Sequence, residues 1–237
     1  MKTLLILVVI MMLSQRMFAQ EFTNSMPTFT DSDILLEGES VLSLSDLQAQ
    51  AEQGDSQSQR RLGNRYFQGT GIPRNSIEAV KWYRLSAGQG NERAQRWLGR
   101  IFFEGNGVIQ DYSESARWME LAGQKGDNLS QRRLGFLYYE GLGVTKSFVE
   151  AARWYRRAAE QGNATAQFKL GGMFRNGEGV TKDAVTSYMW INISAVNGDQ
   201  NYIGDRNLFE STLSAGQVAD GQLRARICFT SDYQDCD

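Results

Sequence analysis

The sequence predicts an all-α fold of small helical hairpins stacked side by side, because several features repeat at one fixed spacing. Tryptophans stand 36 residues apart, at Trp82, Trp118, Trp154 and Trp190. Leucine–glycine pairs keep the same step, at Leu62-Gly63, Leu98-Gly99, Leu134-Gly135 and Leu170-Gly171. So do paired glycines at Gly69/Gly71, Gly105/Gly107, Gly141/Gly143 and Gly177/Gly179. A period of roughly 20–50 residues indicates one structural unit stacked on copies of itself.

The N-terminus has the character of an export signal. Lys2 precedes an apolar run from Thr3 to Leu13, and Ala19 is a suitable last residue before cleavage. The run is too short for a bilayer, which needs roughly 20 helical residues. We therefore expect 1–19 to be a signal peptide and the protein to be exported, periplasmic or secreted, and not an integral membrane protein; an uncleaved anchor is the alternative. Residues 20–44 are polar and aperiodic, which predicts a flexible linker.

The repeat begins with a half unit. Shifted by one period, Leu47 aligns with Tyr83 and Ala51 with Ala87, so residues 45–55 match a second helix without its first and predict an N-terminal cap. Residues 56–198 then hold four units, each with a helix A, a glycine turn and a helix B. The predicted helices A cover 56–68, 92–104, 128–140 and 164–176. Each helix B is expected to begin at an N-cap residue: Asn75, Asp111, Ser147 or Asp183.

The glycine after each helix-A leucine needs a physical reason, because glycine costs roughly 1 kcal/mol relative to alanine inside a helix. We expect close approach of helix A to a neighbouring helix, with the aromatic residues filling the remaining space.

The pattern lapses after Gly198, where Arg206 takes the place of a fifth leucine. Residues 199–226 are expected to form capping helices, 200–212 and 215–226, with Ser214 as an N-cap. The two cysteines, Cys228 and Cys236, should form a disulfide in an oxidising compartment and staple the tail 227–237.

Composition excludes several functions. The formal net charge of −2 argues against general nucleic-acid binding. The absence of histidine removes the commonest general base and metal ligand. We expect no metal site, no cofactor and no catalytic residue.

These residues resemble the Sel1-like repeat family, a relative of the tetratricopeptide repeats. The fullest copy runs from Leu134-Gly135 through Tyr138, Gly141 and Gly143 to Ala151-Ala152-Arg153-Trp154-Tyr155 and Gly162. The resemblance implies a right-handed α/α superhelix of about four Sel1-like helix-turn-helix repeats. It also implies an adaptor that binds a protein or peptide, associated with envelope, signalling or host-contact processes. A monomer is expected.

In such an array the helices A line the concave side, where a partner would bind. The candidate binding residues are Arg60, Asn64, Phe67, Arg96, Arg100, Phe103, Arg132, Phe136 and Tyr139. Arginines suit an acidic or carboxylate-bearing peptide, and aromatics supply apolar contact. The alternative is structural: the arginines lie on a solvated face, and the aromatics fill the space between helices.

An enzyme is the competing interpretation. Some exported, cysteine-rich relatives are linked to β-lactams, so an envelope ligand-binding module or weak hydrolase acting on β-lactam or peptidoglycan is the alternative function. This chain lacks their repeated cysteines and contains neither Ser-x-x-Lys nor Lys-Thr-Gly, which that serine chemistry requires.

Overall fold

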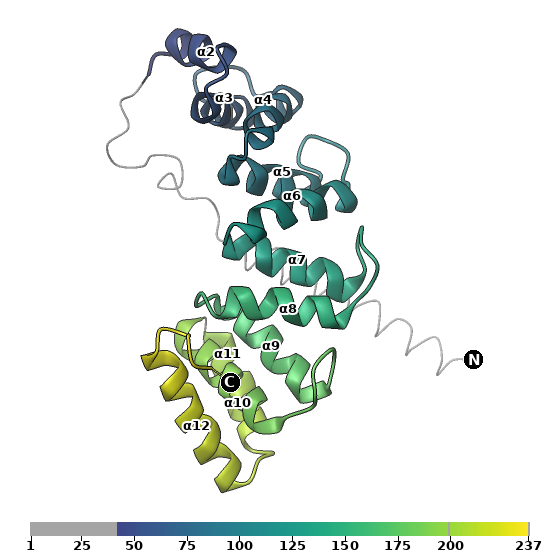
Figure 1. Cartoon of the computed structure of the whole chain (residues 1–237), viewed down its shortest axis with the longest axis vertical. Coiled ribbons are helices and arrows are strands. Elements are labelled where there is room, and N and C mark those ends of the chain that lie inside the picture. The colour runs from purple at the N-terminus through teal and green to yellow at the C-terminus, as the bar shows by residue number, and fades with distance from the viewer. Residues whose placement is uncertain (1–41, 199, 237) are drawn as a thin grey trace, which may run out of the picture. The chain divides into compact units, whose positions relative to one another are not determined.

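The computed structural model describes residues 42–198 and 200–236, and every regular element in those ranges is an α-helix (Figure 1). The helices are α2 (Leu44–Glu52), α3 (Ser56–Gln68), α4 (Ser76–Gly88), α5 (Glu92–Glu104), α6 (Tyr112–Gln124), α7 (Asn128–Glu140), α8 (Phe148–Ala159), α9 (Ala164–Asn176), α10 (Ala184–Asn197), α11 (Gln200–Glu210) and α12 (Ala215–Thr230). The predicted all-α fold is confirmed. The predicted signal peptide 1–19, and the linker 20–44 up to residue 41, lie outside the described residues.

Within residues 44–237 the helices form successive antiparallel hairpins. Helix pairs α3–α4, α5–α6, α7–α8 and α9–α10 make the most extensive contacts, and each pair packs on the next through α4–α5, α6–α7 and α8–α9. Helix α2 packs on α3 and buries Leu47 and Ala51, as the aligned half unit requires.

Side-chain caps fix where the helices begin. The predicted N-caps of the helices B accept hydrogen bonds from backbone N–H groups of the first turn: Asn75, Asp111, Ser147 and Asp183. The helices A have N-caps as well, namely Asp55, Asn91, Asp127 and Asn163. Each helix A ends at a glycine with positive φ: Gly69, Gly105, Gly141 or Gly177.

The glycine inside each helix A lies against its own helix B. A Cβ atom at Gly63 would come 2.8 Å from Tyr83 Cδ1, and one at Gly171 would come 2.7 Å from Ile191 Cγ1. The absence of a side chain therefore lets the two helices of a unit approach closely, as the sequence predicts.

The second turn glycine joins neighbouring units. A Cβ at Gly143 would overlap the backbone of Tyr112, and one at Gly179 would overlap the backbone of Phe148, at the start of the preceding helix B. Ser113 Oγ also donates a hydrogen bond to the Gly143 carbonyl at 3.1 Å. The turns of the second, third and fourth units are thus seated on the first residues of the preceding helix B.

Aromatic side chains fill the space between helices. Trp118, Trp154 and Trp190 are buried, whereas Trp82 in the first unit is half-buried. Tyr83 is also fully buried, and burial raises the pKa of its hydroxyl well above its usual value.

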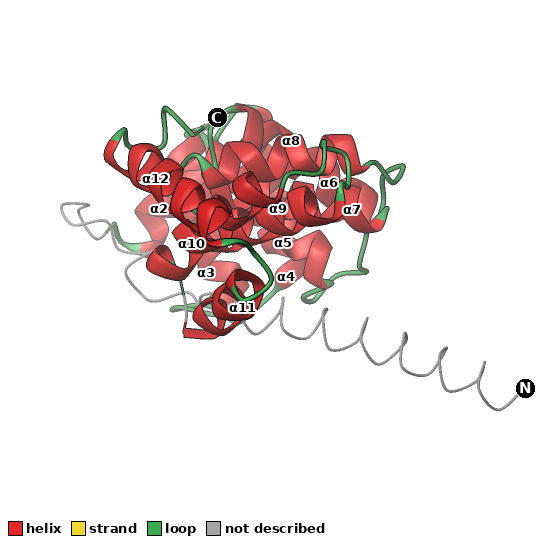
Figure 2. Ribbon diagram, turned by 90° about the horizontal axis from the view of Figure 1, so that it is seen from below, coloured by secondary structure: helices red, strands yellow, loops and turns green. Residues whose placement is uncertain are grey.

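The C-terminal helices depart from the hairpin pattern. Helices α11 and α12 both pack on α10, but they make at most marginal contact with each other (Figure 2). Both helices pack around the buried Tyr188 of α10: Phe209 comes from α11 and Val218 from α12. Helix α12 also continues past the predicted end at Arg226 to Thr230, so Cys228 lies within the helix rather than in a tail.

Candidate functional site

The predicted binding residues lie on α3, α5 and α7, but the structure does not leave all of them outward. Arg60 and Arg132 are each 3% exposed, and Asn64 and Phe103 are also buried. Arg96, Arg100, Phe67, Phe136 and Tyr139 are half-buried. This corrects the expectation of an open row of arginines: the side chains at one repeat position differ in exposure from unit to unit.

Arg96 joins two units. Its guanidinium forms an ion pair with the Asp127 carboxylate at 3.0 Å, and Asp127 is the N-cap of α7 in the next unit. The equivalent N-caps are the uncharged Asn91 and Asn163, so only the second of these three arginines meets an acidic cap. Arg60 donates instead to Gln57 Oε1 at 3.3 Å. Arg96 therefore lies in a contact between two units rather than on a solvated face.

Asn64 has a partner within its own hairpin. The buried Tyr83 hydroxyl donates a hydrogen bond to Asn64 Oδ1 at 2.7 Å. The pairing links α3 to α4, and it means that Asn64 contributes to packing in addition to any role in binding.

Two arginines share one carboxylate at the middle of the array, and a third arginine is the sequence neighbour of one of them. Arg100 pairs with Glu104 at 2.7 Å, and Arg133 reaches the same carboxylate at 3.8 Å. Arg132 adjoins Arg133 on α7. We call Arg100, Arg132, Arg133 and Glu104 the central arginine cluster. Arg100 and Arg132 are among the binding residues predicted from the sequence, but Arg133, which lies one position away from the repeating arginine, is not.

Burial makes this cluster electrostatically demanding. The pKa of Arg133 is lowered to about 9, chiefly by removal from water and also by the neighbouring positive charge of Arg132, while Glu104 opposes the change. Burial also lowers the pKa of Arg132. A desolvated guanidinium interacts more strongly with a carboxylate than a solvated one does, since water screens the charges less.

Aromatic side chains border the cluster. Trp97 lies with its ring 5.7 Å from the Arg100 guanidinium carbon, an arrangement typical of a cation–π contact. Phe103 packs edge-on against Phe136, at 6.0 Å between ring centres, and against Tyr112 at 5.5 Å. Phe103 is thus part of the packing between helices, as the structural alternative expects, and the half-buried Phe136 is the more accessible ring.

Phe67 and Tyr139, the first and last aromatic residues of the predicted binding set, each pack against another aromatic ring. Phe67 lies 5.5 Å from the Trp97 ring of the next unit. Tyr139 contacts Phe148 at 5.1 Å, and its hydroxyl donates to Glu178 at 3.0 Å. Burial and that hydrogen bond raise the pKa of Tyr139 to about 12. Both side chains therefore tie neighbouring elements together.

A row of buried glutamines was not predicted from the sequence. At each unit a helix-A glutamine donates its amide N–H to a carbonyl at the end of the preceding helix, at 2.8–3.1 Å. The pairs are Gln59–Ala51, Gln95–Ala87, Gln131–Gly123 and Gln167–Ala159. The signal was available, because the four glutamines also stand 36 residues apart. Each of these carbonyls also accepts a backbone N–H from the turn that follows it, so the glutamine adds a second hydrogen bond and ties helix A to the preceding helix.

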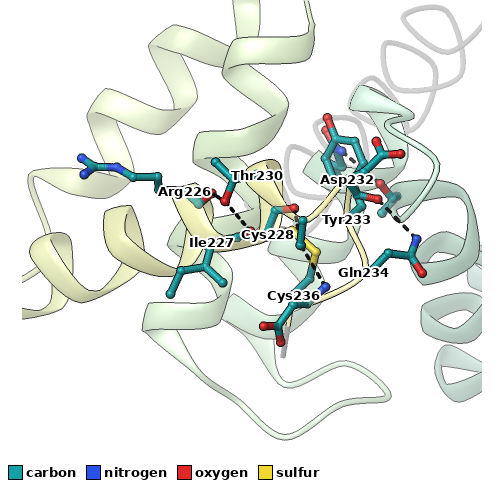
Figure 3. The surroundings of a disulfide bond; sticks show 12 residues. Arg226, Ile227, Cys228, Thr230, Asp232, Tyr233, Gln234 and Cys236 are labelled. Carbon is teal, nitrogen blue, oxygen red and sulfur yellow. Dashed lines mark hydrogen bonds between the residues drawn. A yellow bond between two sulfur atoms is a disulfide. The ribbon is translucent and has the colours of Figure 1, made fainter.

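The predicted disulfide is present. Cys228 on α12 bonds to Cys236, and the turn between them folds back over the end of the array (Figure 3). Tyr233 in this turn accepts a hydrogen bond from Asn197 Nδ2 at 2.6 Å, and its backbone N–H donates to the Cys228 carbonyl at 2.8 Å. The bridge thereby holds Tyr233 against the end of α10.

The described residues offer little for metal or membrane chemistry. No group of three or more cysteine, aspartate or glutamate side chains in this part of the chain could hold a metal ion. None of the described helices combines the length and the apolar character needed to cross a bilayer.

Comparisons with known proteins agree with the repeat architecture. A family model described as Sel1 repeat matches residues 56–91, 92–127, 128–163 and 164–199. The solved structures include a Sel1 repeat protein from Oxalobacter formigenes, which is 27% identical with a TM-score of 0.62 over 82% of this chain and 72% of that one. They also include c5321, a protective antigen of uropathogenic Escherichia coli strains, which is 28% identical with a TM-score of 0.51; the match covers 79% of this chain but 49% of that one. A search of curated proteins gave no match.

Proposed function

We propose that this chain, which belongs to the Sel1 repeat family, is an exported, non-catalytic scaffold that holds another polypeptide on the helix-A face of its units. Sel1 repeat proteins are generally scaffolds for protein interaction, and the array is built like theirs. The proposal adds where on the array the partner binds and which chemical groups the partner carries.

The central arginine cluster carries the proposal. The Arg100 and Arg133 guanidinium groups both approach the Glu104 carboxylate, and Arg133 and its sequence neighbour Arg132 are each less than 10% exposed. Burying a charge costs free energy unless the charge is paired and hydrogen-bonded. A carboxylate from a partner could join the Glu104 carboxylate of α5 beside these arginines.

The neighbouring rings narrow the class of partner. Phe136 is half-buried beside the cluster, and Trp97 underlies Arg100. A segment with an acidic side chain next to an apolar one could place its carboxylate on the arginines and its apolar group on Phe136. We therefore propose an acidic, partly apolar peptide segment as the ligand, bound without a cofactor.

Export is supported by two features of the chain. Residues 1–19 have the composition of a signal peptide, and the two cysteines form a disulfide. Both suit an oxidising compartment such as the periplasm or the exterior of the cell.

Site-specific crosslinking in the native cell tests the location. A photo-reactive residue placed at Phe136 should capture a partner, whereas the same residue at Val149, which is 63% exposed on α8, should not. Capture from Val149 alone would move the partner to the helix-B face and would contradict the proposal.

The captured partner then allows a quantitative test of the cluster. Replacing Arg100 and Arg133 with glutamine removes two charges but keeps side chains of similar length. We expect the Kd to rise at least about tenfold, which corresponds to about 1.4 kcal/mol. Arg117→Gln and Arg153→Gln are matched controls, since both arginines are 63% exposed on helices B. Equal affinity of cluster and control variants, with unchanged thermal unfolding, would contradict an acidic ligand at this site.

A further inference from the structure

The two ends of the array differ in the character of their outer faces. At the N-terminal end, the exposed side chains of α2 are short or polar: Ser45, Asp46, Ala49 and Glu52. A polar outer face is what a terminal unit of a repeat array needs in water. At the C-terminal end, Leu223 and Ile227 of α12 are 53% and 43% exposed. The C-terminal helix therefore exposes large apolar side chains, beside polar ones such as Gln222 and Arg226, where the N-terminal cap exposes none.

Helix α12 carries a ridge of mostly small or apolar residues. Gly216, Ala219, Leu223, Ile227 and Thr230 follow one another at steps of three or four residues, and all five are exposed. Residues at these steps share one side of a helix. Arg226 and Ile227 point away from the disulfide in Figure 3. The small residues at one end of the ridge permit close approach of another helix.

A groove lies beside the ridge, between α10 and α12. It encloses about 320 Å³ and is lined mainly by Ile193, Val196, Ala225, Arg226 and Phe229. Val196 and Phe229 are 66% and 51% exposed, so the groove is open and apolar. Helix α12 lies beside α10 at the end of the stack (Figures 1 and 2), so the ridge and the groove belong to adjoining sides of the same helix.

We propose that a second copy of this chain covers this surface, so that two chains form a two-fold dimer through α12. In an antiparallel pair of α12 helices, the Leu223–Ile227 ridge of each copy lies in the partner's groove, against Val196 and Phe229. A two-fold interface requires one patch that is complementary to itself. A ridge and a groove side by side on one face meet that requirement. This differs from the monomer expected from the sequence, and it does not depend on the proposed function.

The size of the surface sets the expected strength. Helix α12 has 16 residues and is therefore about 24 Å long. Ridge and groove together span about two helix diameters, which gives roughly 500 Å² on each copy and about 1,000 Å² in total. That area is near the lower limit for a specific interface. The dimer should therefore be reversible, with a Kd on the order of 10–100 µM.

Sedimentation velocity of the purified protein tests the proposal. Between about 1 and about 200 µM, a range that brackets this Kd, the mass should shift from monomer to dimer. Leu223→Glu and Val196→Glu should each raise the Kd at least about tenfold. The control is Val149→Glu, which changes an apolar residue of similar exposure on α8 and should leave the Kd unchanged. A monomer throughout the range would overturn the proposal and assign the surface to another occupant, as would a dimer that all three variants preserve.

A mixing experiment separates a lost interface from a damaged fold. Leu223→Lys places a cation on the ridge, and Val196→Glu places an anion in the groove. Each variant alone should stay monomeric. Their mixture should form a heterodimer, because one of its two ridge–groove contacts pairs the lysine with the glutamate. Absence of any heterodimer, when both variants unfold thermally like the natural chain, would overturn the proposed pairing of ridge with groove.

Discussion

The four repeated units and the C-terminal helices solve the same packing problem in different ways. In each unit, helix A and helix B are close partners, and a buried glutamine ties helix A to the preceding helix. After α10 the next two helices diverge, and each packs on α10 separately. The contrast shows which residues of the repeat make a hairpin close.

The positions that close the hairpin are the ones that change. Counted on by four repeats, Ile203 stands for the buried glutamine, Arg206 for the leucine and Asn207 for the helix-A glycine. Leu213 and Ala215 replace the two turn glycines. Without the small residue the helices cannot approach, and without the glycines the turn cannot take positive φ at low cost. Apolar residues in α11 and α12 are therefore not enough to form a fifth hairpin, because the small helix-A residue and the two turn glycines are missing.

A covalent bond supplies what the fifth unit lacks. The disulfide holds Tyr233, which bonds Asn197, and Asn197 in turn donates to Gln167 at 3.2 Å. The last member of the glutamine row is thus connected to the tail. In the units the helices are held together by contacts that repeat, whereas the C-terminal turn is held by a single disulfide.

The largest effect should come from a turn glycine inside the array. Gly143→Ala forces alanine into a positive φ and drives its Cβ into the backbone of Tyr112. We expect a loss of about 3–4 kcal/mol in the free energy of unfolding, from strain and overpacking together. Gly71→Ala is the matched control, because Gly71 has a similar φ but a Cβ there would come no closer than 3.5 Å to its nearest neighbour, Arg65 Nη1. Urea unfolding should show a loss of only about 1–2 kcal/mol there.

Equal losses for the two glycines would contradict the role assigned to the turn in stacking. They would mean that backbone conformation alone explains the repeated glycines.

Removing the disulfide should have the next largest effect, and it should be local. Replacing Cys228 and Cys236 with serine opens the loop of separation 8 and is expected to cost about 2–3 kcal/mol. Hydrogen exchange should accelerate in α12 and at the end of α10, but not in α3–α6. Uniform acceleration along the array would instead show that the bridge stabilises all units as one cooperative body.

The sequence predicts the units far better than the site. Spacing alone indicates the helices, the N-caps such as Asp111 and the close approach at Gly63, because these depend on local chemistry repeated four times. The cysteine pair is likewise determined by composition. Side chains at one repeat position are less predictable, since Arg96 meets Asp127 where Arg60 meets Gln57. Such partners come from the neighbouring turn or unit, and a pattern that averages over units conceals them.

The smallest expected effect comes from a substitution that restores a repeated hydrogen bond, which the second unit lacks. Gln89 and Gln161 donate to Gln59 Oε1 and Gln131 Oε1, each at 2.8 Å. At the equivalent place Lys125 donates to the Gly90 carbonyl at 2.5 Å instead, and the buried Gln95 Oε1 has no hydrogen-bond partner among the described residues. Because the Gln89 amide also reaches the Gly54 carbonyl, at 3.0 Å, a glutamine at position 125 can make both bonds.

We therefore expect Lys125→Gln to stabilise the protein by about 0.5–1 kcal/mol, the net value of one added hydrogen bond to a buried acceptor. Thermal unfolding at two salt concentrations checks the result, because a gain from hydrogen bonding persists at high salt whereas one from removing a charge diminishes. Lys146→Gln, an exposed lysine on the α7–α8 turn, is the control for charge removal. A loss of stability at both salt concentrations would show that the lysine contact with the Gly90 carbonyl matters more than completing the glutamine row.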